Sequence, residues 1–334
     1  MTITITTGNR QVTDFTAYIE DFSANFESAG RGVFSNGLGG DYAGAEAQIT
    51  DTATPDAQAY ILRDDIVYSM STHTLSGTVS GIELGYGATA SDAENGTQDI
   101  ALDQLDQLDY SIKFAPAVDG ADASAALIYG MLDADFEPLI DQLKAQDIRF
   151  FGSAGDDSFS GYGNDDRLKG GLGNDRLQGN RGEDVLIGAK GHDTLLGGAQ
   201  ADKLKGGLGR DVLKGGKGED TLLGGAHADK LKGGAHNDVL NGGGGRDKLI
   251  GGSGEDTFIF KGNFGRDVVR DFTIGEDVLD LSALTDEATS LDAFVDAATD
   301  TGSRVIFDMG DDGQNVIILN GVSLDDLTAD DFLF

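Results

Sequence analysis

A nine-residue period without a gap constrains this chain more than any other feature of its sequence. The period runs from Gly152 to Ile259, which is 108 residues or twelve units. One clear unit reads Gly170-Gly171-Leu172-Gly173-Asn174-Asp175-Arg176-Leu177-Gln178. The sixth position is aspartate in all twelve units, and the eighth is phenylalanine in the first and last units and leucine in the other ten. A flexible linker would not keep leucine in register, so the period predicts a regular repeat fold.

The residue types within one unit predict how it folds. Glycine at positions one, two and four supplies backbone angles that other residues adopt only at a cost, which predicts a tight turn over six residues. The remaining three residues predict a short strand whose central leucine points inward and whose neighbours point outward. Two such units make one coil, so equivalent turns on the same side are 18 residues apart and are stacked ~4.8 Å apart.

The constant nine-residue spacing of the aspartates predicts a metal-binding role. Two bare carboxylates ~5 Å apart repel by roughly 3 kcal/mol at an effective dielectric constant near 20. A hard divalent cation with oxygen ligands between them turns that repulsion into attraction. Twelve aspartates form two columns of six, which predicts up to about ten Ca²⁺ ions. The candidate ligands are Asp157, Asp166, Asp175, Asp184, Asp193, Asp202, Asp211, Asp220, Asp229, Asp238, Asp247 and Asp256.

Some units depart from the pattern at the glycine positions. We expect strained turns or weaker binding where another residue replaces glycine. These residues include Asn164, Gln200, His227 and His236 at position four and Ser153, Asn180 and Ala189 at position two. The repeat histidines occupy variable turn positions and are interpreted as surface substitutions. The segment Ala201-Asp202-Lys203-Leu204-Lys205 recurs 27 residues later, which indicates duplication of three units and no separate function.

Nonapeptides of this pattern are identified as members of the RTX family of calcium-binding repeats. The resemblance implies an all-β parallel β-roll over residues 152–259, in which backbone carbonyls of the same turns complete each calcium shell. Phe258, Phe260 and Phe264 then predict an aromatic cover for the last coil, as part of a small mixed cap over residues 260–334. Strands are expected over residues 304–309 and 315–319, and a short helix over 291–298.

The charge and the two ends of the chain bear on its location and partners. The net charge of −34 argues against binding of nucleic acid, because a polyphosphate would be repelled. Residues 1–151, 152–259 and 260–334 contribute −18, −3 and −13. The sequence holds no cysteine, no apolar run of membrane-span length and no N-terminal signal-peptide pattern. The end Asp330-Asp331-Phe332-Leu333-Phe334 resembles the uncleaved C-terminal signal of type I secretion substrates, which implies a secreted, extracellular protein and the type I secretion apparatus as a partner.

Residues 1–151 mix helical and strand patterns, which predicts an α+β domain. Phe15, Ile19, Phe22 and Phe26 recur at helical spacing. The expected elements are a strand over 1–6, a helix over 12–28, strands over 59–62 and 66–70 around a turn at 63–65, strands over 75–84 and 110–114, and helices over 124–132 and 137–145, the last with Pro138 in its first turn.

The first domain resembles haem-acquisition haemophores of the HasA type. The similar segments are Met1–Thr6, Phe15–Phe22, Ile66-Val67-Tyr68, His73–Gly77 and Ile128–Leu132. The resemblance implies that Tyr68 ligates ferric haem and that His73 hydrogen-bonds its phenol oxygen; a phenolate is a suitable ligand for Fe(III). The loop between them is shorter than in the family. His73 is the only histidine of residues 1–151, which excludes ligation by histidine and tyrosine from two sides.

Two functions remain open at this point. One is a calcium-loaded haem scavenger that delivers haem to a receptor or takes it from haem proteins. The other is an extracellular structural, adhesive or self-assembling matrix protein with no haem. Motifs for serine hydrolases, zinc proteases and phosphate loops are missing from the sequence, so we expect no enzymatic activity. Bound calcium would make residues 152–259 cationic, whereas residues 1–151 and 260–334 would stay acidic. Attraction between these parts predicts calcium-dependent self-association that weakens with added salt.

Overall fold

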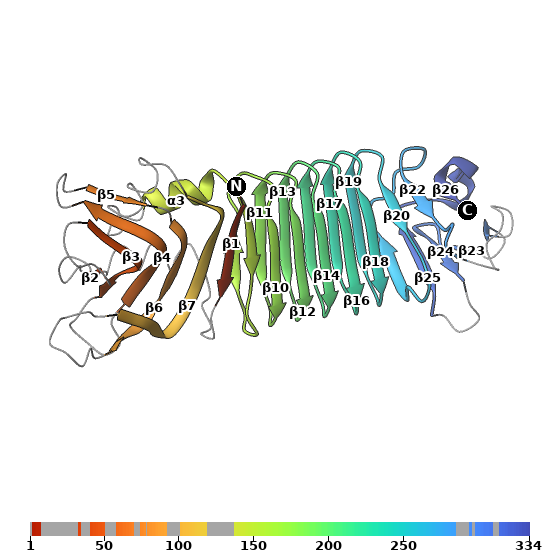
Figure 1. Cartoon of the computed structure of the whole chain (residues 1–334). Coiled ribbons are helices and arrows are strands. Elements are labelled where there is room, and N and C mark those ends of the chain that lie inside the picture. Colours follow the sequence, from red (N-terminus) through yellow and green to blue (C-terminus); the bar gives the residue numbers. More distant parts are fainter. Residues whose placement is uncertain are drawn as a thin grey trace. The chain divides into compact units, whose positions relative to one another are not determined.

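The computed structural model describes two compact units, Met1–Phe159 and Ser160–Phe334 (Figure 1). The described residues are 2–7, 33–34, 41–50, 58–69, 74–77, 79–91, 101–118, 137–284, 294–295, 298–309 and 314–334. Strand β9 (Ser158–Ser160) spans the boundary between the units in the sequence. None of the helices in these ranges has the length and apolar character that a membrane crossing requires.

The first unit contains a mostly antiparallel sheet with the strand order β2-β3-β4-β6-β7-β1-β8. Strand β1 pairs antiparallel with β7 and parallel with β8, and β5 pairs with β4. Helix α3 (Glu137–Lys144) precedes β8 and confirms the helix expected over 137–145. The strands are β1 (Thr2–Thr7), β2 (Val33–Phe34), β3 (Asp41–Thr50), β4 (Gln58–Ser69), β5 (Thr74–Gly77), β6 (Val79–Ser91), β7 (Ala101–Val118) and β8 (Asp147–Phe151).

Two strand predictions in this unit are wrong in detail. Residues 59–62 and 66–70 were expected to form a hairpin, but Gln58–Ser69 is one strand. Strand β4 stays paired with β3 on one side, where a register shift between Gly44 and Glu46 accommodates the irregularity. Its other side changes partner from β6 to β5, which divides the single strand expected over 75–84 into two. The helices expected over 12–28 and 124–132 lie outside the described residues.

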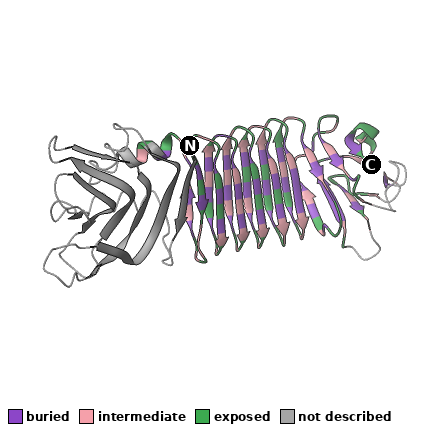
Figure 2. Cartoon of the chain, viewed as in Figure 1, coloured by how far each residue is buried: buried purple, intermediate pink, exposed green. Residues whose placement is uncertain are grey.

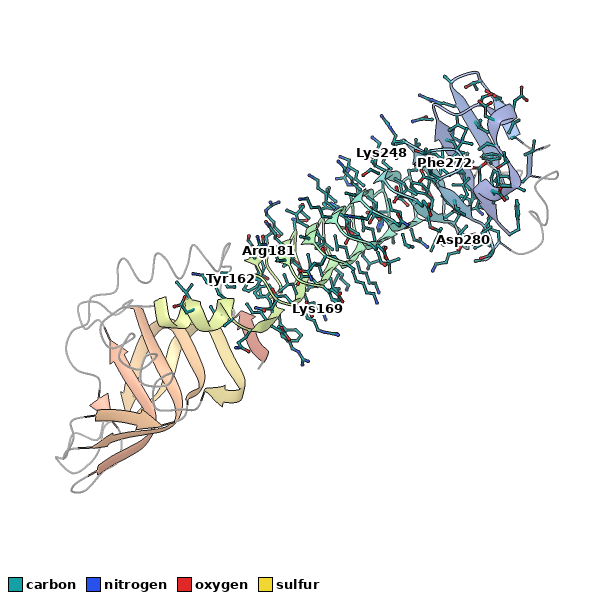
Figure 3. All side chains as sticks on the ribbon, turned by 90° about the horizontal axis from the view of Figure 1, so that it is seen from above. Tyr162, Lys169, Arg181, Lys248, Phe272 and Asp280 are labelled. Carbon is teal, nitrogen blue, oxygen red and sulfur yellow. The ribbon has the colours of Figure 1, made fainter. Side chains whose placement is uncertain are left out.

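The second unit is a parallel β-solenoid formed by two sheets. The strand order is β10-β12-β14-β16-β18-β20-β22-β26 in one and β11-β13-β15-β17-β19-β21-β25-β24-β23 in the other. Figure 3 shows Arg181 and Lys248 of the second sheet on one side and Lys169 and Asp280 of the first sheet on the other. The repeat strands are β10 (Arg167–Leu172), β11 (Arg176–Arg181), β12 (Val185–Lys190), β13 (Thr194–Ala199), β14 (Lys203–Leu208), β15 (Val212–Lys217), β16 (Thr221–Ala226), β17 (Lys230–Ala235), β18 (Val239–Gly244) and β19 (Lys248–Ser253).

Parallel pairing joins residues 18 apart, as the two-unit coil requires. Leu186 pairs with Leu168 on one side and with Leu204 on the other. The strands are twice as long as the three residues expected, because positions one to three of the next unit continue the same ladder. The turn is correspondingly shorter, and only positions four to six connect one strand to the next.

The position-eight side chains form the core of the solenoid. The ten leucines from Leu168 to Leu249 are at most 1% exposed. Figure 2 shows the result as alternating buried and exposed bands across the repeat strands. Each buried leucine contributes about 1.5–3 kcal/mol relative to an exposed one, so this column alone strongly favours the coil.

Positions two and four require the left-handed backbone region. Most glycines at these positions have positive φ, for example +130° at Gly198. Five of the predicted replacements share that region: Asn180, Ala189, Gln200, His227 and His236, with φ from 80° to 87°. These five confirm the predicted strain, which costs roughly 1–2 kcal/mol at each non-glycine residue. Ser153 and Asn164 do not adopt positive φ, so the strain expected there is not found.

A small cap follows the last repeat and buries aromatic side chains. Phe258, Phe260 and Phe264 are at most 1% exposed, which confirms the aromatic cover. The strands expected over 304–309 and 315–319 are β24 and β25. The helix expected over 291–298 falls largely outside the described residues. The remaining strands are β20 (Thr257–Ile259), β21 (Arg266–Val269), β22 (Val278–Asp280), β23 (Ala298–Asp300), β24 (Arg304–Asp308), β25 (Val316–Asn320) and β26 (Phe332–Leu333).

The C-terminal residues are part of this cap. Strand β26 pairs parallel with β22, and Phe332 packs against Phe294 and Phe307 with ring centroids 5.3 and 6.1 Å away. Asp331 is fully buried; its Oδ1 accepts a hydrogen bond from the N–H of Gly275, and its Oδ2 accepts from the N–H and hydroxyl of Thr328. The segment that resembles a secretion signal therefore lies against the last coil in the folded chain.

Candidate metal centre

The position-six aspartates form two ladders along the solenoid. The N–H of Asp184 donates to Oδ1 of Asp202 at 2.9 Å, and the N–H of Asp211 donates to Oδ1 of Asp229 at 2.8 Å. The same bond joins successive aspartates from Asp166 to Asp256 in one ladder and from Asp175 to Asp247 in the other, at 2.7–2.9 Å. The stacking predicted from the 18-residue spacing is therefore present.

The second oxygen of each of these carboxylates is buried and accepts no hydrogen bond. The side chains from Asp166 to Asp256 are at most 2% exposed, and their Oδ2 atoms accept no hydrogen bond. An unpartnered buried carboxylate oxygen costs more than a lost neutral hydrogen bond, because the charge is removed from water. A regular row of such oxygens indicates that something outside the chain supplies the missing positive charge.

Glycine at position one lets each Oδ2 approach the backbone more closely than a Cβ would allow. A Cβ atom on Gly179 would overlap Oδ2 of Asp184 and lie 2.8 Å from the carbonyl oxygen of Gly197, one coil further on. A Cβ atom on Gly206 would likewise overlap Oδ2 of Asp211 and lie 2.6 Å from the carbonyl oxygen of Gly224. The position-one glycines do not have positive φ, so the sequence interpretation was wrong in one respect. Glycine is needed there for space beside the carboxylate, and the backbone angle requires it only at positions two and four.

Burial changes the acidity of these groups in both ladders. Loss of hydration raises the pKa of Asp202 to about 8 and that of Asp229 to about 8, despite the hydrogen bond that each accepts. Burial likewise raises the pKa of Asp184 to about 7 and that of Asp220 to about 6. The charged carboxylates are thus disfavoured in the protein alone, and a bound cation would favour them.

The donor set fits calcium. A carboxylate oxygen and a backbone carbonyl oxygen lie together at Gly161, Gly179, Gly197, Gly206 and Gly224, and both are hard ligands of the type that Ca²⁺ accepts six to eight at a time. No group of three or more His, Cys, Asp or Glu side chains gathers as a metal cluster in the described ranges. The repeat histidines His192, His227 and His236 are all exposed in turns. The site is thus built from single aspartates and backbone oxygens repeated along the coil.

The ladders extend beyond the nonapeptides, which the sequence analysis missed. The N–H of Asp247 donates to Oδ1 of Asp267, 20 residues later, and the N–H of Asp256 donates to Oδ1 of Asp277, 21 residues later, both at 2.9 Å. A signal was available in the sequence. Gly275-Glu276-Asp277-Val278-Leu279 repeats Gly182-Glu183-Asp184-Val185-Leu186 without a change, but the longer coils between the aspartates hide the period.

The two ladders end differently. Oδ2 of Asp267 is buried and unpartnered, and burial raises its pKa to about 8. Oδ2 of Asp277 instead accepts a hydrogen bond from the N–H of Thr273 at 2.8 Å. Asp271 lies near this second end, where its carboxylate accepts from the N–H groups of Gly251 and Gly252. One ladder therefore finishes with a free carboxylate oxygen and the other with a carboxylate that the protein satisfies.

The residues predicted to bind haem are not brought together by what the structure describes. Tyr68 lies near the end of β4, where it pairs with Tyr42 of β3 and Leu75 of β5. His73 lies outside the described residues. At the start of the repeats, Oδ2 of Asp157 accepts hydrogen bonds from the N–H and hydroxyl of Ser153.

Comparisons with known proteins agree with the repeat assignment. Residues 149–269 match the family described as "RTX calcium-binding nonapeptide repeat (4 copies)" through six overlapping segments. Residues 149–269 are therefore a run of RTX calcium-binding repeats, a type that is typical of secreted proteins. No curated protein matches the chain.

Similar solved structures include three kinds of bacterial protein. The apo hemophore HasA from Yersinia pestis is 19% identical, with 43% of this chain and 86% of that chain covered and a TM-score of 0.35. The extracellular lipase LipA from Serratia marcescens is 20% identical, with 56% and 40% covered and a TM-score of 0.26. The AlgE6R3 subunit of the Azotobacter vinelandii mannuronan C5-epimerase is 30% identical, with 43% and 78% covered and a TM-score of 0.28.

Proposed function

We propose that the solenoid binds a row of Ca²⁺ ions between successive turns and that this binding drives its folding. The observation that carries the proposal is the regular row of buried Oδ2 atoms from Asp202 to Asp256, which accept no hydrogen bond and lie so close to a position-one glycine that a Cβ there would overlap them. The twelve aspartates named above supply the carboxylates, and Asp267 adds one at the end of a ladder. Carbonyl oxygens of neighbouring coils complete the ligand shells.

Calcium binding couples to folding because the site does not exist in the unfolded chain. Without the ion, the stacked carboxylates must be buried without compensation, and the coil cannot form. Extracellular calcium modules have dissociation constants of ~0.1–1 mM. Sites in this range are filled at the calcium concentration outside a cell and empty at that of the cytosol. The chain would then remain unfolded over the repeats before export and would fold outside.

A pair of matched variants tests the assignment of ligands. Asp256→Asn keeps the shape of a ladder side chain but removes its charge, whereas Glu255→Gln removes the same charge from the exposed neighbour. Calcium titration by calorimetry on the full chain should show one site lost or weakened at least tenfold for Asp256→Asn and wild-type binding for Glu255→Gln. Equal binding by all three proteins would refute the role of the ladder carboxylates.

Export through a type I secretion apparatus is the proposed route, with residues 330–334 as the signal. Phe332 and Asp331 are buried in the folded cap, so the apparatus would have to recognise the segment before the cap forms. Secretion of the full chain should fail when Phe332-Leu333-Phe334 is replaced by alanines and should persist when exposed Lys261 is replaced. Export of the triple variant at the wild-type level would refute this route.

Haem binding by the first unit is the proposed second activity, and the sequence resemblance around Tyr68 and His73 supports it. A tyrosinate at the end of β4 would be the axial ligand of ferric haem. Addition of hemin to the full chain should give a Soret band that Tyr68→Phe abolishes, that His73→Ala weakens, and that Tyr60→Phe in the same strand leaves unchanged. A band that persists in Tyr68→Phe would overturn the assignment.

The alternative is a matrix or adhesive protein that uses calcium only for its structure. A wild-type chain without a Soret band after hemin addition would favour this alternative. Both functions are binding functions, and we propose no catalytic step for either unit.

A further inference from the structure

The two turn edges of the solenoid carry opposite charge at position five. Turns of the even-numbered units lead from the second sheet to the first and carry Asp165, Glu183, Ala201, Glu219, Asn237 and Glu255, here called the acidic edge. Turns of the odd-numbered units lead back. Position five is Asp156 in the first unit, and from the third unit onward it is Asn174, His192, Arg210, Ala228 and Arg246, here called the basic edge. All of these residues are exposed, so the separation of charge is a property of the surface.

A hollow interrupts the basic edge at Ala228. It has a volume of about 410 Å³, and its cationic lining is Arg210, Lys230, Arg246 and Lys248, with His192 at one end. Arg210 and Arg246 precede and follow Ala228 by one coil each, because the three residues are 18 apart in the sequence. The missing side chain at Ala228 therefore leaves two guanidinium groups facing a common space.

The four cations of this hollow are not paired with any side chain in the part of the chain that the structure describes. Among the described residues, none of the four side chains takes part in an ion pair or a side-chain hydrogen bond, and all four are exposed. Every acidic residue between 160 and 259 occupies position five or six, so the neighbouring outward positions add no negative charge. Asp211 and Asp229 also line the hollow, but they belong to the ladder that calcium would neutralise.

We propose that this hollow binds a tetrahedral oxyanion, a sulfate or phosphate ester group. Two arginines one coil above and one coil below can converge on a tetrahedral oxyanion, since coils are ~4.8 Å apart and guanidinium groups bind such anions through paired N–H donors. Lys230 and Lys248 add charge from the adjoining strand positions, and Lys248 is labelled in Figure 3. The site rests on the calcium-folded solenoid, and calcium bound to Asp211 and Asp229 makes it more positive.

The chain contains its own control for this site. The segment Ala228-Asp229-Lys230-Leu231-Lys232 has the same sequence as Ala201-Asp202-Lys203-Leu204-Lys205. The two copies are 27 residues apart, which is three units, so they lie on opposite edges. Arg210 and Arg246 lie one coil to either side of Ala228, whereas Glu183 and Glu219 lie one coil to either side of Ala201. Equal substitutions in the two copies therefore differ only in the surrounding charge.

Calorimetric titration of the full chain with sucrose octasulfate, in millimolar calcium and at physiological ionic strength, tests the proposal. Wild type should bind with a saturable affinity that Ala228→Glu lowers by about tenfold or more, while Ala201→Glu changes it by less than about twofold. Arg210→Ala with Arg246→Ala should give the same loss as Ala228→Glu. Calcium titration and circular dichroism of each variant establish that it folds. Inorganic sulfate, as a second probe, distinguishes a site for the free anion from one that needs the ester on a sugar.

Three outcomes would overturn the proposal. The first is the lack of saturable binding of sucrose octasulfate by the folded wild-type chain. The second is an equal loss of affinity in Ala228→Glu and Ala201→Glu, which would show general charge attraction. The third is self-association in the absence of sulfate, seen as an increase in mass by light scattering, that is lost in both Arg210→Ala and Glu219→Ala. This result would show that the basic edge binds the acidic edge of a second copy. Failure of calcium binding would appear separately in the calcium titration and would concern the proposed function.

Discussion

The acidic and basic edges of the solenoid have the same buried aspartate ladders but opposite charges at the exposed position five. Asp202 and Asp229, at the same place in identical segments, have the same ladder hydrogen bonds, the same unpartnered Oδ2 and a pKa raised to about 8. Their exposed neighbours one coil away are glutamates on one edge and arginines on the other. The buried positions are thus fixed by the metal site and the core, and the exposed position five is free to differ.

This difference shows how one repeat can serve two purposes. Because a coil contains two units, even-numbered units form one edge and odd-numbered units the other. Substitutions that recur every two units therefore change the surface of one edge only. The ladders inside are not affected, because position five points away from the calcium spaces.

Removal of calcium should unfold both edges together. Each pair of stacked carboxylates repels by roughly 3 kcal/mol at an effective dielectric constant near 20, and several such pairs exceed the ~5–15 kcal/mol stability of a typical domain. Hydrogen exchange of the full chain, resolved by peptide, should show loss of protection over residues 160–281 in EGTA and its return in millimolar calcium. Protection that persists in EGTA on either edge would contradict the proposed coupling.

Alanine at position one should damage the two ladders equally. In Gly215→Ala the new Cβ would overlap the carboxylate of Asp220, and in Gly224→Ala it would meet Asp229 and the carbonyl oxygen of Gly242. We expect each variant to lose about 1–3 kcal/mol from overpacking and to lose one calcium site in titration. Gly163→Ala is the control, because a Cβ there has no neighbour within 4 Å. A stable Gly215→Ala with full calcium binding would show that the space is not a site.

The ends of the two ladders should respond differently to removal of charge. Asp267→Asn takes a carboxylate from a space with an unpartnered oxygen, so calcium stoichiometry should fall by one. Asp277→Asn changes a carboxylate whose oxygens both accept backbone hydrogen bonds, so it should lower stability by about 1–2 kcal/mol without loss of an ion. Calorimetry with calcium and thermal unfolding measure the two effects. Equal stoichiometry in both variants would remove the distinction, and exposed Glu276→Gln serves as the control.

Glycine at Ala189 should stabilise the solenoid slightly. Ala189 has a φ of 87°, and relief of this strain outweighs the added flexibility of glycine in the unfolded chain by about 0.5–1 kcal/mol. The neighbouring substitution Ala199→Gly, at a strand position without positive φ, should destabilise by a similar amount. Thermal unfolding in saturating calcium compares the two, and a lower midpoint for Ala189→Gly would contradict the strain.

The repeat fold could be predicted from the sequence because its period is strict. Leucine at position eight fixes which residues face inward, and aspartate at position six fixes where the carboxylates are stacked. Both follow from residues that are always of one type, and the structure places them as expected. The first unit gave weaker predictions, as the single strand Gln58–Ser69 shows, because strand ends there depend on which partner is paired at Arg63 and Ile66.

The coil, its core, its ladders and the backbone strain at residues such as Ala189 all follow from the nine-residue repeat. Where the ladders end is visible only in the folded chain, because Asp267 and Asp277 join them across coils of unequal length. The folded chain also gathers Arg210, Lys230, Arg246 and Lys248 around one hollow. The physical reason is that a nearest neighbour in the solenoid is set by pairing between coils, so residues 18 to 21 apart meet while adjacent units do not.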